Sequence, residues 1–315
     1  MSTLAPSQNV TSRDPKGLKF ISIVEAQYNK AGLSDGPDGE AQRINDTALS
    51  NLADLIANFI SEARRSDKFK GKEVRSSYTY PNEYKGPKPI DKQLLSLSIA
   101  LNLDPASALE YATHLPALES FVPADALKWT GWFAVPSLAS LATIAEKHFP
   151  EVKDMTERYC RTILFVFGKL AASRPFQNWR EGQITSEQLR MTARLLRAME
   201  ILAETQKGDI LIIAAQLGMR HRGRCTGRAR EVFVANEVGL GSLMGSSIAL
   251  THPERFVRWE ELDMDLPGDE FSPDADGQFV EAPILFVGDG GLRFGTSDVG
   301  GADGRCGSAS FFLPQ

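Results

Sequence analysis

Apolar residues recur at three- and four-residue steps along most of the chain. In residues 46–65 they form one stripe of an amphipathic helix: Leu49, Leu52, Leu55, Ile56, Phe59, Ile60 and Ala63. The pattern continues through residues 90–206, where prolines fall between or at the starts of the periodic segments. We predict helices over residues 91–101, 105–114, 123–133, 136–148, 151–172 and 186–206, and a short one over 251–262.

β structure is predicted mainly near the two ends of the chain, with residues 232–235 as one further possible strand. Residues 18–26, LKFISIVEA, are β-branched and apolar enough for one strand. Residues 279–287 and 292–296 flank the sequence GDGG, which is typical of a hairpin turn. The sequence therefore predicts a mainly α fold: a multi-helix bundle core with a small β-hairpin near the C-terminus and extended N- and C-terminal arms.

The same pattern suggests three parts. Residues 1–45 are interpreted as an N-terminal arm with one possible strand, residues 46–262 as a helical core domain, and residues 263–315 as an acidic loop, a β-hairpin and a C-terminal tail. Residues 1–17 of the arm are polar, and the tail ends in FFLPQ after a glycine-rich segment. The tail is expected to dock on its own domain or on a neighbouring subunit. We expect the arms to contact neighbouring copies, so the chain is predicted to form homo-oligomers.

Composition narrows the class of protein. The 315 residues are 42% hydrophobic and 24% charged with a net charge of −5, which excludes a globally basic nucleic-acid coater. Any polyanion site must therefore be local. The three cysteines are odd in number and lack metal-ligand spacing, which favours a reducing, cytoplasmic compartment. No apolar run approaches membrane-spanning length, so no membrane partner is predicted.

The densest positive cluster lies in residues 210–250, between two apolar segments. Arginine presents a planar fork of donors that matches phosphate or carboxylate, and glycines within the cluster suggest a loop whose N–H groups also face an anion. A second set of arginines is spaced at steps of four and three on the predicted helix over 186–206. If this stripe faces the cluster, the two sets form one positive groove. Pairing of the stripe with Glu187, Glu200 and Glu204 on the same helix is the favoured alternative. The candidate nucleic-acid-binding residues are Arg220, His221, Arg222, Arg224, Arg228, Arg230, Arg190, Arg194 and Arg197.

Three functions are compatible with these arginines. The first is a self-assembling, non-enzymatic, RNA-binding or DNA-binding protein of coat (capsid) or nucleoprotein type, which grips the phosphates of single-stranded nucleic acid. The second is a soluble enzyme or ligand-binding protein for a phosphorylated small molecule or nucleotide. The third is a scaffold in which the arginines pair with the acidic segment 263–276 and bind no ligand. The first is our principal hypothesis.

Other motifs add no chemistry. Gly239, Gly241 and Gly245 are spaced G-x-G-x-x-x-G, but no alternation of strands and helices precedes them, so a small-residue helix face is favoured over a dinucleotide site. Residues 263–274 fail the calcium-loop pattern because Pro267 occupies position five, Glu270 replaces the usual apolar residue at position eight, and Asp274 replaces the bidentate glutamate at position twelve. No nucleophile elbow, Walker A lysine or H-E-x-x-H motif is present. We therefore predict no catalytic residue, no metal and no cofactor, and the balance of motifs is against an enzyme.

Overall fold

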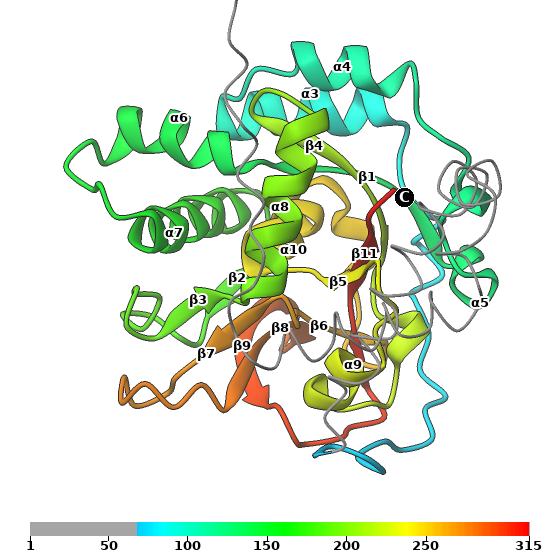
Figure 1. The fold of residues 1–315 in the computed structure, drawn as a ribbon. Coiled ribbons are helices and arrows are strands. Elements are labelled where there is room, and N and C mark those ends of the chain that lie inside the picture. Colours follow the sequence, from blue (N-terminus) through cyan, green and yellow to red (C-terminus); the bar gives the residue numbers. More distant parts are fainter. Residues whose placement is uncertain (1–67, 315) are drawn as a thin grey trace, which may run out of the picture. The chain divides into compact units, whose positions relative to one another are not determined.

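The computed structural model describes residues 68–314, which lie within one unit of the chain, Arg65–Gln315. The predicted N-terminal arm, its strand over 18–26 and the helix over 46–65 lie outside the described residues. In the described part, helices and strands are interleaved along the chain, and the strands form two sheets (Figure 1). The fold is mixed α/β, so the prediction of a mainly α helical bundle is wrong.

The first sheet has four strands in the order β1-β4-β11-β5, and every pairing in it is antiparallel. The two central strands are almost entirely buried. β11 comes from the extreme C-terminus, so the predicted C-terminal tail is seated in the sheet of its own chain. The strands are β1 (Thr130–Pro136), β4 (Ile210–Gln216), β5 (Glu237–Gly239) and β11 (Ser310–Phe312).

The second sheet has seven strands. Its main path is β10-β6-β8-β7-β3, with β9 paired to β8 and β2 paired to β9. The strands are β2 (Phe176–Asn178), β3 (Leu189–Met191), β6 (Asp263–Asp265), β7 (Asp269–Phe271), β8 (Glu281–Gly288), β9 (Gly291–Asp298) and β10 (Cys306–Ser308).

Helices cover the first sheet and fill the space between the sheets. In Figure 1, α3 and α4 lie over β1 and β4, while α6 and α7 lie side by side. The helices are α3 (Ile90–Leu101), α4 (Ala106–Ala112), α5 (Ala124–Leu127), α6 (Leu138–His148), α7 (Met155–Ser173), α8 (Ala193–Thr205), α9 (Thr226–Val232) and α10 (Ser242–Thr251), with 3₁₀ turns η1 (Leu118–Ser120), η2 (Met219–His221) and η3 (Pro253–Arg255).

Helix α10 connects the two layers. It contacts β1 of the first sheet, β8 of the second, and α7, and nearly all of its residues are buried. Its small side chains make this possible, because a Cβ at Gly245 would overlap the side chain of Leu266. Of the residues predicted to form a small-residue helix face, Gly245 lies on α10, whereas Gly239 belongs to β5 and Gly241 precedes the helix.

Two strands replace predicted helix. The helix predicted over 123–133 ends at Leu127 as α5, and Trp132 and Phe133 belong to β1. The helix predicted over 186–206 begins only at Ala193, after β3. The helix predicted over 251–262 is limited to the single turn η3. The strand partners of β1 and β3 are distant in sequence, and a short apolar run cannot by itself distinguish a buried strand from a helix.

The outer edge of β1 is closed by a buried glutamine. Gln93 of α3 accepts a hydrogen bond from the Ala134 N–H at 2.9 Å and donates one to the Trp132 carbonyl at 3.0 Å. These are the groups that a further strand would otherwise pair. The side chain therefore satisfies the backbone of an edge strand beneath a helix.

The predicted C-terminal hairpin is confirmed. β8 and β9 pair antiparallel, and their two-residue turn consists of Asp289 and Gly290, both with positive φ (44° and 78°). This conformation is that of a type I′ turn, for which Asp-Gly is a favoured sequence. The hairpin forms one side of the groove described below.

Candidate functional site

The arginine cluster lies mainly on η2 and α9 and is engaged by its own chain. His221 Nε2 is 2.7 Å from Glu237 Oε1, and both side chains are buried. Arg220 lies between Glu237 at 3.7 Å and Asp125 at 3.4 Å. Arg224 pairs with Glu73 at 3.0 Å. These residues form one internal polar network.

The other members of the cluster are held in the same way. Arg222 donates to the Tyr78 carbonyl at 3.0 Å, and Arg228 pairs with Glu231 at 3.2 Å. Arg230 donates to the carbonyls of Pro267 and Asp269 at 2.9 and 2.6 Å. Arg222 and Arg230 therefore link segments that are distant in sequence, and Arg228 pairs with a residue of its own helix.

The predicted arginine stripe on one helix does not form. Arg190 lies on β3, where it pairs with Glu270 at 2.9 Å and stacks on the ring of Phe279. Arg194 and Arg197 do lie on α8. Arg194 donates to the Val234 and Ala235 carbonyls, and Arg197 pairs with Glu200 at 3.1 Å on the surface.

These contacts decide how the cluster is interpreted. Guanidinium groups that already bind carboxylates and carbonyls are not arranged to receive phosphates without breaking those contacts. Nothing in residues 68–314 supports an RNA-binding, nucleoprotein-like or capsid role, and the description as a helical bundle is wrong. The contacts of Arg190 and Arg230 correspond instead to the third reading, in which arginines engage the acidic segment.

The glycine motif also lacks room for an anion. β5 is followed by α10 in a strand–turn–helix arrangement, but the first turn of the helix receives the side chain of Asp269. The Ser242 N–H donates to Asp269 Oδ2 at 2.6 Å, and Tyr159 donates to the same carboxylate. This protein therefore places its own carboxylate where a pyrophosphate would bind.

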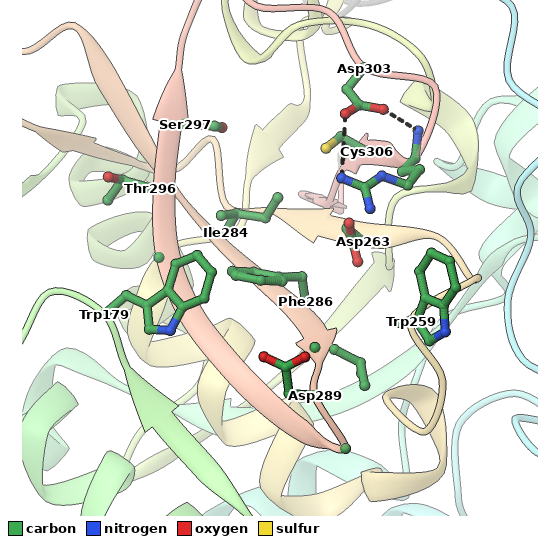
Figure 2. A pocket seen from close by; sticks show the side chains of 15 residues that line it. Trp179, Trp259, Asp263, Ile284, Phe286, Asp289, Thr296, Ser297, Asp303 and Cys306 are labelled. Atoms are coloured by element: carbon green, nitrogen blue, oxygen red, sulfur yellow. Dashed lines mark hydrogen bonds and ion pairs between the residues drawn. The ribbon is translucent and has the colours of Figure 1, made fainter.

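A groove lies beside the β8–β9 hairpin. Its volume is about 730 Å³, within the range of small-molecule sites. Figure 2 shows Trp179 and Trp259 on opposite sides, with Phe286 between them, and Asp263 and Asp303 toward one end. The two indoles come from different parts of the chain: Trp179 directly follows β2, and Trp259 lies between η3 and β6.

The aromatic side chains differ in how they are held. Trp179 meets Phe286 edge-to-face with ring centroids 5.0 Å apart, and the guanidinium of Arg293 lies 4.8 Å from its ring centroid. Trp259 is 59% exposed and makes no ring or cation–π contact with any residue in 68–314. Trp259 therefore presents an open apolar surface to the groove.

The carboxyl group of Asp263 is the least satisfied polar group in the groove. The residue is 7% exposed, and its side chain makes no hydrogen bond or ion pair with another described residue. Burial raises its pKa to about 7, against the opposing effects of Arg305 and Arg255. Burial also raises the pKa of the adjacent Asp265 to about 7, and the charge of Asp263 contributes to that rise. The pair therefore titrates near neutrality, as an acid–base group or a ligand-binding carboxylate would.

The remaining chemistry of the groove is limited. Burial raises the pKa of the Cys306 thiol, so it stays protonated and is not an activated nucleophile. No group of three or more potential ligands among residues 68–314 is placed to hold a metal ion. Within the same residues no helix has the length and apolarity needed to span a membrane.

Sequence reasoning did not predict the groove. The sequence places Asp263 in an acidic loop, as the first position of a calcium-loop pattern or as a partner of the arginines, and the structure places it in strand β6. Trp179 and Trp259 are brought together by β2 and β6, which belong to the sheet that the mainly α prediction omitted. Both tryptophans are exposed, which is unusual for so large an apolar side chain, and the sequence alone does not show their exposure.

Comparisons with known proteins provide no identity for the chain. No protein-family model, curated protein or solved structure matches it. The function must therefore be inferred from the geometry alone.

Proposed function

We propose that this protein binds a small organic molecule in the groove between Trp179 and Trp259. The observation that carries the proposal is the carboxyl group of Asp263, which is buried, lines the groove and has no protein partner among the described residues. A buried carboxyl group without a partner costs stability, and a ligand that hydrogen-bonds to it offsets this cost.

The surroundings fit this role. Small-molecule sites combine apolar and aromatic walls with a few convergent polar groups. Here the walls are Trp179, Trp259 and Phe286, and the polar groups include Asp263 and Arg305. Asp263 and Phe286 are positioned by strands β6 and β8, which limits the ordering that these two side chains need when a ligand binds, whereas Trp179 and Trp259 lie in turns.

A ligand-observed NMR screen with a chemically mixed fragment library tests the proposal. Fragments that bind the native protein should lose their saturation-transfer signal with Trp259→Ala, because that change removes one wall. Ile99→Ala is the matched control, since Ile99 is an exposed apolar residue on α3 that does not line the groove. A screen without hits, or hits that persist equally in Trp259→Ala, would refute the proposal.

A further inference from the structure

The charges that line the groove are unbalanced. Three aspartates face one arginine, which gives a net charge of −2 when all four groups are ionised. Asp289 forms an ion pair with Arg293. Asp303 accepts a hydrogen bond from the backbone N–H of Arg305 at 2.8 Å, and its carboxylate lies 3.8 Å from the Arg305 guanidinium. Asp263 is the lining aspartate that no such contact compensates.

An occupant of this site must satisfy the Asp263 oxygens. An ionised carboxylate only accepts hydrogen bonds, and its two oxygens offer several acceptor positions. A charged N–H donor forms a shorter and stronger bond to such an oxygen than a neutral donor does. Among simple organic groups, an ammonium supplies both donors and the compensating charge.

The aromatic side chains favour the same group. A cation is attracted to the face of an indole within about 6 Å of its centroid, and tryptophan is the strongest of the aromatic residues in this interaction. Arg293 already makes this contact with Trp179, while Trp259 makes no such contact with a described residue. Phe286, between the two indoles, offers an apolar surface for a hydrocarbon stem (Figure 2).

We propose that the groove selects a primary ammonium group on an apolar stem, with the ammonium donating to Asp263 beside the face of Trp259 and the stem lying against Phe286. This inference rests on the proposed function, and names the ligand class of the same site. Free amines and the side chain of a peptide lysine share this chemistry.

Binding of such a cation must depend on pH. The charged and titratable groups that act on Asp263 or its partner Asp265 are Arg255 from η3, Asp303 and Arg305 from the segment before β10, Cys306 on β10, and Arg230 from α9. An ammonium beside Asp263 adds positive charge to this set and favours the ionised carboxylate. Because the pKa of Asp263 is about 7 in the free protein, ligand binding displaces its proton below neutrality.

The direction in which affinity changes with pH distinguishes an ammonium ligand from a neutral hydroxyl ligand. At pH 5 only about 1% of a carboxyl group with this pKa is ionised, so ammonium affinity should fall about 100-fold between pH 8 and pH 5. A neutral hydroxyl ligand that accepts the proton of Asp263 would bind more tightly at pH 5, and one indifferent to it would show no change.

Matched probes test the inference by isothermal titration calorimetry. Cyclohexylamine and cyclohexanol have similar ring shape and differ in charge, so the amine should bind at least tenfold more tightly at pH 8. Near pH 6 it should release close to one proton, measured as a difference in heat between phosphate and MOPS buffers. Asp263→Asn should abolish both effects. Asp274→Asn, an exposed aspartate that does not line the groove, should change neither.

Each outcome has a defined meaning. If cyclohexanol binds as well as the amine and Trp259→Ala removes both, the ligand class is wrong and the groove function stands. If the amine fails to bind while other fragments bind through Trp259, the inference is likewise overturned. If Asp263→Asn binds the amine normally, the assigned contact is wrong. Nα-acetyl-lysine amide keeps the side-chain ammonium, and Nα-acetyl-norleucine amide lacks it. Tighter binding of the lysine amide than of cyclohexylamine would indicate a peptide lysine, and the reverse would indicate a free amine.

Discussion

His221 and Glu237 share a buried hydrogen bond, with His221 Nε2 2.7 Å from Glu237 Oε1. On its other side, the Arg224 guanidinium lies 3.0 Å from Nδ1 of His221. Because a guanidinium only donates, Nδ1 accepts and Nε2 carries the proton. His221 is therefore a neutral histidine that lies between the Arg224 cation and the Glu237 carboxylate, where η2 meets β5.

Replacing Glu237 with glutamine should destabilise the fold. The Glu237 carboxylate also accepts from the Ser310 hydroxyl at 2.6 Å and lies 3.7 Å from Arg220, whose side chain is only 9% exposed. The amide leaves this guanidinium without its buried counter-charge, and removing one partner of a buried pair typically costs about 3–5 kcal/mol. Urea unfolding followed by circular dichroism measures the effect. Exposed Glu187→Gln is the control, and a loss no larger than that of the control would contradict the prediction.

The same pair should make the fold sensitive to acid. Burial lowers the pKa of His221, and Glu237 keeps a lowered pKa because His221 and Arg220 outweigh the effect of burial. Because the pKa of His221 is lower in the folded protein than in the unfolded chain, the unfolded chain binds the proton more readily. The free energy of unfolding therefore falls as pH drops below the unfolded value of about 6.5. The carboxylate adds a loss in the same direction near pH 4 and below. Midpoints of urea unfolding from pH 8 to pH 4 should show a smaller acid loss in His221→Asn than in the native protein.

How far the sequence predicts the fold depends on the range of the interactions. α3, α6 and α7 were predicted closely because each has a 3.6-residue apolar period and stays helical throughout. β4 was missed because its seven residues are all buried and have no alternation of apolar and polar positions. The β8–β9 hairpin was predicted because the turn signal is local.

The candidate site was less predictable than the fold. The arginines 220–230 attracted attention because they are dense in sequence, but their partners include Glu73 and Asp125, which lie far from them in sequence. Conversely, the sequence does not distinguish Asp263 from the other carboxylates of its acidic segment, and Trp259 belongs to no motif. Asp263 becomes a candidate because it is buried, and Trp259 because it is exposed. The sequence shows where arginines are clustered, but the tertiary structure determines which carboxylates pair with them.

Tyr159→Phe tests the internal anion site at α10. Tyr159 donates to both oxygens of Asp269, at 3.0 and 2.9 Å, and Asp269 accepts from the first N–H of α10. Burial raises the pKa of Asp269 to about 6, and the hydrogen bond from Tyr159 opposes that rise. Removing the hydroxyl should therefore raise this pKa further and destabilise the protein by about 1–3 kcal/mol at pH 8. The loss should shrink at pH 5, where the carboxyl group is protonated. A loss equal at both pH values would indicate a packing effect.

Gln93→Leu tests the closure of the first sheet. The leucine fills the buried position on α3 but leaves the Ala134 N–H and the Trp132 carbonyl without the partner that Gln93 supplied. Buried unsatisfied groups cost about 1–3 kcal/mol each, so urea unfolding should detect a loss within or above that range. Leu95→Ala, at an exposed position of the same helix, is the control. A neutral Gln93→Leu variant would mean that the edge of β1 finds other partners.

Asp263 should reveal its role through stability as well as binding. Its folded pKa of about 7 lies above the ordinary aspartate value of 3.8, so the free protein carries an unfavourable charge above neutrality and loses that cost as pH falls. Asp263→Asn should therefore stabilise the free protein at pH 8, by at most about 4 kcal/mol since one pKa unit corresponds to about 1.4 kcal/mol, and by much less at pH 5. Thermal unfolding at the two pH values measures this difference. A carboxylate that serves only the fold would give the opposite sign at pH 8, because its removal would cost stability. A variant that is more stable yet unable to bind amines would identify Asp263 as a residue maintained for a ligand at the expense of the fold.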